Sequence, residues 1–177
     1  MSIKKNKTLI IAAVAVIVAI AIFVLLFGGG SKKTPIDGYD DTTTYEQVAK
    51  EYKKYDVTLS DTVIQVKDYE WDGMTGNIRF EFYSTTKTLK RIHFSVDVQT
   101  RKGHTAEEIW DTYERAEKAY RYVRDYYKLD SIKGKDYEHS KEYESSGFAA
   151  GGLVSCYLSW FKGSDFTVTT FWIEYHT

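Results

Sequence analysis

One hydrophobic run in the chain is far longer than any other, and it lies close to the N-terminus. Residues 9–27 are 19 consecutive apolar side chains. A helix of this length spans about 28 Å, close to the roughly 30 Å hydrocarbon core of a bilayer. A single span has to be helical, because lipid offers backbone groups no other hydrogen-bond partner. The run therefore predicts a transmembrane helix over residues 9–27, with the lipid bilayer as its partner.

The residues that flank this run set its expected orientation. Three lysines precede it and two follow it, and the more positive side usually stays in the cytoplasm. We expect a cytoplasmic tail over residues 1–8, with the rest of this single-pass cell-membrane protein outside the cytoplasm. A cleaved signal peptide is the alternative, because residues 28–30 are small enough for a cleavage site. The apolar segment of a signal peptide is usually shorter, at about 7–15 residues.

The apolar run is followed by a segment with the composition of a tether. Residues 28–43 are rich in Gly, Ser and charged side chains and contain the single Pro of the chain, which is typical of a flexible linker. Residues 44–177 are enough to bury a hydrophobic core. We therefore expect a flexible linker over 28–43 and a folded extracytoplasmic domain over 44–177.

Two segments of this domain carry the pattern of an amphipathic helix. Thr44 with Gln47, and Thr105 with Glu108, match the capping box, in which each side chain binds a free backbone N–H at the helix start. Apolar residues then recur every three or four positions. In the second segment these are Ile109, Tyr113, Ala116, Tyr120, Val123 and Tyr127. The pattern predicts a helix after Thr44 and a longer one after Thr105.

Five other segments show the period of two that is typical of a half-buried strand. They are residues 64–67, 78–83, 91–98, 153–161 and 166–176. In the last one, Phe166 and Val168 are out of phase with Phe171, which predicts a bulge near Thr169 and Thr170. Residues 136–152 are polar and then Gly-rich, and we expect them to form a connection.

The order of these elements is helix, three strands, helix, two strands. Short polar links between the first three strands indicate antiparallel neighbours. The sequence therefore predicts an α+β domain of about five antiparallel strands with two helices on one face of the sheet. No sequence motif assigns it to a known family.

The net charge bears on which partner the chain can bind, and the cysteine content bears on its cellular compartment. The chain has 24 Lys and Arg against 25 Asp and Glu, so its net charge gives no reason to expect nucleic acid as a partner. Cys156 is the only cysteine, which excludes an intramolecular disulfide and a Cys-based zinc site. Its phase within residues 153–161 places it in the core. An exported domain without disulfides suits a bacterial protein.

The histidines and acids do not form a recognisable catalytic, cofactor or metal site. None of the four histidines belongs to an HxH or HExxH pair. His139 lies near Glu138 and Glu142, but a metal site needs three or four converging ligands, and we expect an exposed loop there. The Cα atoms of His93 and Asp97 are about 13 Å apart along one strand, so the two side chains cannot pair directly. The Gly-rich residues 147–152 lack the Lys and the following helix of a phosphate-binding loop. We therefore predict no cofactor and no metal.

Aromatic residues are the remaining unusual feature, with 15 Tyr and 4 Trp. Several of them fall outside the predicted core stripes, and an exposed aromatic patch marks a binding surface. The candidates for such a surface are Tyr69, Trp71, Tyr83, Tyr122 and Tyr126.

The missing catalytic set and the predicted anchor favour a binding or scaffold module of the cell envelope, with an envelope protein as its partner. The first alternative is a small exported hydrolase of cell-wall material, which would require His104, His139 and Glu142 to converge. The second is a ligand-sensing domain, which would require a cavity between sheet and helices.

Overall fold

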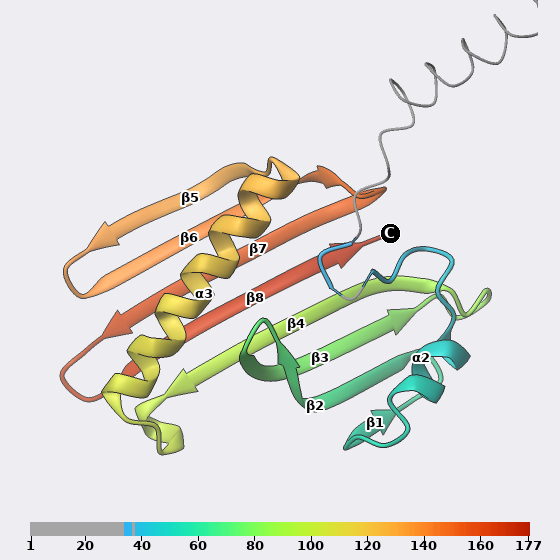
Figure 1. Cartoon of the computed structure of the whole chain (residues 1–177), viewed down its shortest axis with the longest axis horizontal. Coiled ribbons are helices and arrows are strands. Elements are labelled where there is room, and N and C mark those ends of the chain that lie inside the picture. The colour runs from blue at the N-terminus through green and yellow to red at the C-terminus, as the bar shows by residue number, and fades with distance from the viewer. Residues whose placement is uncertain (1–33, 37) are drawn as a thin grey trace, which may run out of the picture. The chain divides into compact units, whose positions relative to one another are not determined.

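The computed structural model describes residues 34–36 and 38–177, and eight strands in this part of the chain form one antiparallel sheet (Figure 1). Their order across the sheet is β1-β2-β3-β4-β8-β7-β6-β5. The strands are β1 Val57–Leu59, β2 Val63–Trp71, β3 Met74–Phe82, β4 Leu89–Gln99, β5 Asp130–Tyr137, β6 Ser140–Ala149, β7 Gly152–Lys162 and β8 Thr167–His176.

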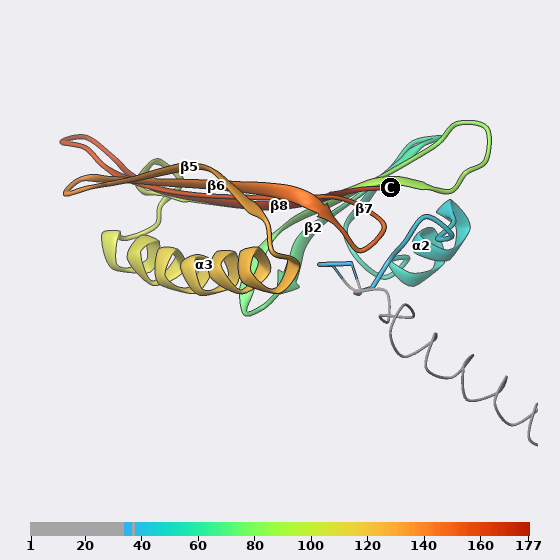
Figure 2. The ribbon, with the colours of Figure 1, turned by 90° about the horizontal axis from the view of Figure 1, so that it is seen from above.

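Both α-helices of the described chain, α2 (Tyr45–Glu51) and α3 (Ala106–Tyr127), lie on the same side of the sheet (Figure 2). We call this side the helix face. A short 3-10 helix, η1 (Thr100–Lys102), leads from β4 towards α3. No element of the described chain covers the other side, which we call the open face. The predicted α+β class and the placement of both helices on one face are confirmed.

The helices begin where their capping residues predict. The hydroxyl of Thr44 accepts from the backbone N–H of Gln47, and the Gln47 side chain accepts from the backbone N–H of Thr44. Thr105 and Glu108 form the same reciprocal pair at the start of α3. The apolar stripe of α3 is buried against the sheet. Burial stabilises α3 beyond its capping, because helices in proteins gain most of their stability from packing of their apolar face.

The sheet has eight strands, and the expected number of about five is wrong. Two of the extra strands, β5 and β6, form a hairpin that includes most of the predicted polar connection 136–152. Most of their side chains are polar and none of the β5 side chains is buried, so they lack the apolar alternation that identifies a half-buried strand. The third extra strand, β1, has three residues and lies at the opposite edge.

The predicted bulge in the last strand is absent. The register between β7 and β8 is continuous from Lys162 and Thr167 to Leu153 and His176. Thr167 and Thr169 face the core in phase with Phe171. The hydroxyl of Thr169 donates to the backbone carbonyl of Ile109 in α3, at 2.9 Å. This hydrogen bond explains how a polar residue occupies a core position, because a buried hydroxyl without a partner is destabilising.

The described residues of the predicted linker belong to the same folded unit as the rest of the described chain. Ile36 is 0% exposed and belongs to the core of the helix face. Tyr39 packs edge-on against Phe80, with ring centroids 5.2 Å apart, and its hydroxyl lies 3.0 Å from that of Tyr52. The described part of the predicted linker 28–43 thus fills space on the sheet beside α2.

The predicted tail 1–8, the predicted transmembrane helix 9–27 and the first residues of the predicted linker lie outside the described residues. Within the described part of the chain, no helix is both long enough and apolar enough to cross a bilayer.

Candidate functional site

A row of three rings crosses the open face from β7 to β4. Tyr157 and Trp172 occupy directly opposed positions on β7 and β8, and their rings stack with centroids 5.7 Å apart and planes 12° apart. On the other side of Trp172, the imidazole of His93 lies 5.9 Å away at 34°. All three side chains are partly exposed. The alternation of β4, β7 and β8 fixes the row, since each residue points away from the helix face.

Glu174 lies beside this row and accepts hydrogen bonds from two imidazoles. His93 Nδ1 is 3.1 Å from one carboxylate oxygen, and His176 Nε2 is 2.7 Å from the other. The guanidinium of Arg91 approaches the carboxylate at 3.7 Å. Partial burial would raise the pKa of Glu174, but the two histidine hydrogen bonds and the charge of Arg91 lower it to about 2. The carboxylate is therefore ionised throughout the physiological pH range.

A second carboxylate extends this charged group towards β3. Glu81 accepts hydrogen bonds of 2.8 Å from both Arg79 and Arg91. Partial burial opposes ionisation of Glu81, yet the two guanidinium groups lower its pKa below the usual range. Arg91 thus lies between two carboxylates, and its Nε is buried without a hydrogen-bond partner. Charges of opposite sign alternate across β3, β4 and β8, which holds their side chains in place.

The other end of the ring row meets a third carboxylate. The hydroxyl of Tyr157 donates to Glu142 Oε1 at 3.1 Å, and Lys133 of β5 pairs with the same oxygen. Side-chain interactions therefore connect the strands of the open face from β5 to β3. We call Tyr157, Trp172, His93, Glu174 and Arg91 the open-face cluster.

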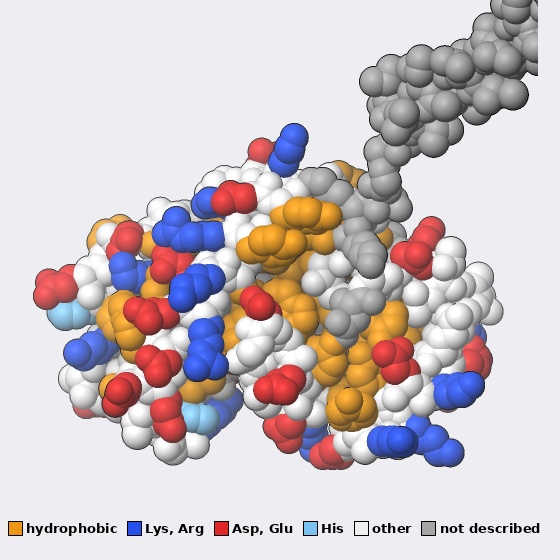
Figure 3. Space-filling view, in the orientation of Figure 1, with side chains coloured by type: hydrophobic (Ala, Val, Ile, Leu, Met, Phe, Trp, Pro, Cys, Tyr) orange, Lys and Arg blue, Asp and Glu red, His pale blue; other side chains and the backbone are white. Residues whose placement is uncertain are grey.

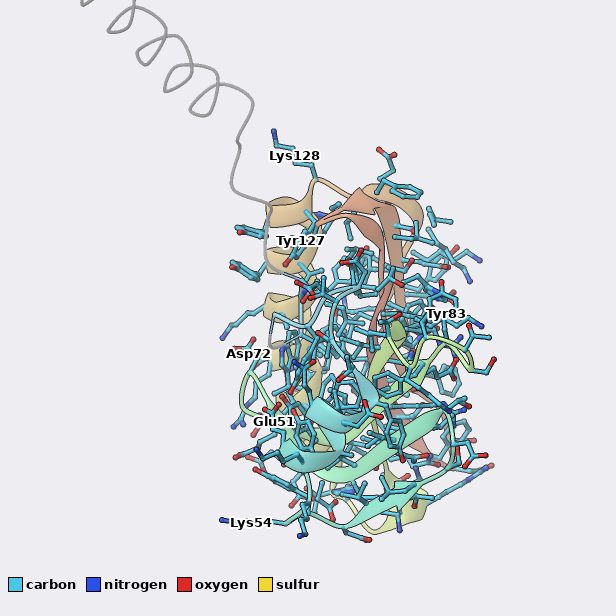
Figure 4. The ribbon with its side chains drawn as sticks, turned by 90° about the vertical axis from the view of Figure 1, so that its right-hand side faces the viewer. Glu51, Lys54, Asp72, Tyr83, Tyr127 and Lys128 are labelled. Carbon is cyan, nitrogen blue, oxygen red and sulfur yellow. The ribbon has the colours of Figure 1, made fainter. Side chains whose placement is uncertain are left out.

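The five aromatic residues predicted from the sequence do not form one surface. Tyr69 is 9% exposed and lies in the core, so it contributes to no surface. Trp71 is partly buried on the helix face, where it stacks on Phe171 with centroids 5.9 Å apart. Tyr83 is exposed after β3, and Figure 4 shows it on the opposite side of the sheet from Tyr127 at the end of α3.

The structure does bring Tyr122 and Tyr126 together. These two residues are one helical turn apart on α3 and exposed, and their rings stack with centroids 5.6 Å apart. They lie on the helix side of the sheet, away from the open-face cluster.

The cluster itself is a set of residues that the sequence analysis missed or set aside. The sequence offers His93 only Asp97 as a neighbour on its own strand. Its actual partner, Glu174, is opposite it on β8. The period of two shows that Tyr157, Trp172 and Glu174 lie on the polar side of their strands. It does not show that β8 lies between β4 and β7, which is what assembles the cluster.

The residues suggested for a hydrolase each have a separate neighbour. His104 pairs with Glu108, His139 with Glu138, and Glu142 with Lys133 and Tyr157. Among the residues that the structure describes, no group of three or more His, Cys, Asp or Glu side chains has the arrangement of a metal site.

Cys156 is fully buried, and burial raises the pKa of its thiol to about 12. Its predicted place in the core is confirmed by this burial. The raised pKa is the opposite of what a reactive cysteine requires.

The hollows on the described surface lie away from the open-face cluster. One of about 110 Å³ lies between α3 and β6 and is lined by Tyr120, Arg124 and Tyr143, among others. Another of about 250 Å³ lies where the β2–β3 turn meets α3, beside His104 and Arg115. A third, of about 370 Å³, lies between α2, the end of β1 and the β3–β4 turn and is wide open to solvent. Typical small-molecule sites measure about 300–1,000 Å³ and enclose most of the ligand, which so open a hollow does not. The open-face cluster instead presents rings and charges on a sheet surface.

Comparison of the chain with protein-family models, curated proteins and solved structures gives no match.

Proposed function

We propose that this protein is a membrane-anchored binding module of the cell envelope, and that its open face binds another protein. The observation that carries the proposal is the open-face cluster on a sheet surface that no described element covers. Residues 9–27 are the proposed single-pass anchor, and the folded domain lies outside the cytoplasm.

The composition of the cluster supports a protein partner. Aromatic residues and Arg are enriched in the centres of protein interfaces and among the residues that contribute most to affinity. Trp172 and Tyr157 offer large rings with few rotatable bonds, and Arg91 offers a guanidinium that two carboxylates already orient. Side chains that are fixed before binding lose less conformational entropy when a partner arrives.

The shape of the surface supports the same class of partner. A stable protein interface buries about 800 Å² on each side, which a broad sheet face provides and a small hollow does not. The sheet is eight strands wide and one of its faces is free of described helices (Figure 2). Neither a convergent catalytic group nor an enclosed cavity among the described residues favours the hydrolase or the sensor.

Site-specific photo-crosslinking in intact cells tests the proposal. A benzophenone amino acid is placed at Ser159, next to the rings on the open face, and in a control protein at Lys118, which is exposed on α3. Both variants are made in the full-length chain. We expect a protein adduct from position 159 and none from position 118. The adduct should be lost when Trp172→Ala and Tyr157→Ala are added. Equal adducts from both positions, or none from position 159, would contradict the proposal.

A further inference from the structure

Two apolar residues beside the β6–β7 turn lie on the open face. Phe148 is 87% exposed and Leu153 36%, and they are directly opposed across the hairpin. An added Cβ on the neighbouring Gly147 or Gly152 would meet a buried side chain of the helix face. Because side chains alternate along a strand, Phe148 and Leu153 point the other way. We call these two residues the apolar pair, and exposed apolar side chains that occur together mark a contact surface.

The apolar pair continues the open-face cluster. Leu153 is directly opposite His176 on β8, and the imidazole of His176 bonds to Glu174. Along β7, Tyr157 of the cluster follows Leu153 by four residues, which is about 13 Å. The cluster and the apolar pair therefore belong to one side of the sheet, and one partner can contact both.

Small side chains separate the apolar pair from the rings. Ser146 and Ser155 are directly opposed in this position, and their hydroxyl oxygens lie 2.7 Å apart. Ser146 also donates to the backbone carbonyl of Val154 at 3.3 Å, so Ser155 donates the bond between the two hydroxyls. Both hydroxyl hydrogens thus have an acceptor within the sheet. A partner can cover these serines without burying an unpaired donor, which would weaken binding.

The charges beside these residues have one sign. Within the described strands β6, β7 and β8, the open face carries Glu142, Glu144 and Glu174 and no Lys or Arg. Lys141 and Lys162 of these strands are directly opposite buried residues and so belong to the helix face. The helix face differs, since Figure 3 shows Lys and Arg interspersed with Asp and Glu over α3. This part of the open face therefore favours a basic partner.

Glu144 differs from the other two glutamates because it has no ion-pair partner among the described residues. Glu142 pairs with Lys133, and Glu174 lies beside Arg91 and two imidazoles. Lys133 is directly opposite Glu144, but its ammonium group contacts Glu142 instead. A cation from a partner would bind Glu144 without competing with an internal ion pair.

An aromatic ring lies next to this carboxylate. Tyr157 is directly opposite Glu144 on β7. Trp172 stacks on one face of the Tyr157 ring, so the other ring face is directed towards β6, where Glu144 lies. A Lys or Arg placed there would contact a carboxylate and an aromatic face together, and both interactions favour a cation.

We infer that the partner binds β6 and β7 through a segment that carries a Lys or Arg for Glu144 and Tyr157 and a bulky apolar side chain for the apolar pair. This inference rests on the proposed binding role of the open face. The two partner side chains would be about 13 Å apart, which corresponds to about four residues of an extended strand or about eight or nine residues of a helix.

Photo-crosslinking in intact cells tests the inference on the full-length chain. A benzophenone amino acid replaces Ser155, between the apolar pair and Tyr157, and the partner segment joined to it is sequenced by mass spectrometry. We expect a protein adduct whose segment has a Lys or Arg and a bulky apolar residue at one of the two spacings. A segment without a Lys or Arg, an adduct with a lipid, or an adduct with a second copy of this chain would overturn the inference.

Substitutions test the two contacts separately. Glu144→Gln and Phe148→Ser should each reduce the adduct at position 155 several-fold, while Glu144→Asp, which keeps the charge, should retain most of it. The controls are Glu138→Gln at the exposed β5–β6 turn and Leu59→Ser, exposed on β1 at the far edge of the sheet, and both should leave the adduct unchanged. Equal adducts from Glu144→Gln and the wild type, or an equal loss from Glu144→Gln and Glu144→Asp, would overturn the cationic contact.

Comparison with position 159 separates failure of this inference from failure of the proposed function. An adduct from position 159 with none from position 155 would overturn the basic and apolar segment and leave the open face as a binding surface. No adduct from either position would overturn both.

Discussion

Trp172 and Tyr157 stack face to face across β8 and β7, with nearly parallel rings on the side of the sheet that carries no helix. In most sheets with one covered face, aromatic side chains point into the core and polar side chains point to water. Here a tryptophan on the outward face lies between a tyrosine and a histidine. The stack should stabilise the free domain and also provide the centre of the binding surface.

The stack should be measurable as a coupling between its two residues. Trp172→Ala, Tyr157→Ala and the double variant form a double-mutant cycle. Chemical denaturation of the full-length protein in detergent should give a coupling of about 0.5–1.5 kcal/mol, as expected for aromatic pairs. The control cycle uses Ser159 and Thr170, the next opposed pair on the open face, and should give less than about 0.5 kcal/mol. Equal coupling in both cycles would show that the rings do not interact.

Glu174 should make stability depend on acid. Its pKa is about 2 in the folded protein and ordinarily 4.5, so the unfolded chain binds the proton more readily. The stabilisation is therefore fully present above about pH 4.5 and is lost as the pH falls towards 2. Glu174→Gln should cost up to about 3 kcal/mol at pH 7 and flatten the pH dependence between pH 4.5 and 2.

Glu144→Gln is the matched control for Glu174. Glu144 also lies on the open face, opposite Tyr157. At each pH between 2 and 7, the denaturation midpoint of this variant should differ little from that of the wild type. A Glu174→Gln protein with the same acid sensitivity as the wild type would show that the two histidines and Arg91 do not hold the carboxylate ionised.

Thr169 should stabilise the contact between β8 and α3 through its hydroxyl. Thr169→Val keeps the shape of the side chain and removes the hydrogen bond to Ile109, so we expect a loss of about 1 kcal/mol. Thr170→Val, on the open face of the same strand, should stay within about 0.5 kcal/mol of the wild type. If the two variants had equal stability in urea, the inward orientation of Thr169 would be wrong.

Ile36 should contribute to the stability of the folded domain although it lies in the segment predicted as a linker. Its side chain is fully buried, and Ile→Ala in a core typically costs about 2–5 kcal/mol. Ile132→Ala provides the comparison, because Ile132 is largely exposed on β5 and should cost less than about 1 kcal/mol. The two variants are compared by thermal unfolding. If Ile36→Ala were as stable as Ile132→Ala, residue 36 would not contribute to the folded domain.

Local patterns predicted the helices and the central strands because those elements bury one apolar face. Thr44 and Thr105 mark the helix starts, and the stripe of α3 follows directly from its spacing. The hairpin of β5 and β6 was not predicted, because its strands lie at an edge of the sheet and carry lysines, acids and serines in place of alternating apolar residues. Charged residues at sheet edges discourage pairing with other chains, and the same residues hide the strand pattern.

The open-face cluster could not be predicted for a different reason. Each of its members was visible as an outward residue on a strand, but Glu174 and His93 are separated by 81 positions in the chain. Their contact depends on β8 entering the sheet between β4 and β7, which no local pattern specifies. Tyr69 is the converse case, a residue predicted on a binding surface that is buried instead. The residues next to it in the sequence do not indicate that Tyr52 and Phe94 pack against it.

Hydroxyl-radical footprinting of the two tryptophans on opposite sides of the sheet tests the binding role of the open face most directly. Trp172 lies in the open-face cluster, and Trp110 is exposed on α3. Oxidation of each is compared between native membranes and purified full-length protein in detergent. We predict that Trp172 is several-fold less oxidised in native membranes, while Trp110 is oxidised equally in both. Equal oxidation of Trp172 in the two samples would contradict a partner on the open face.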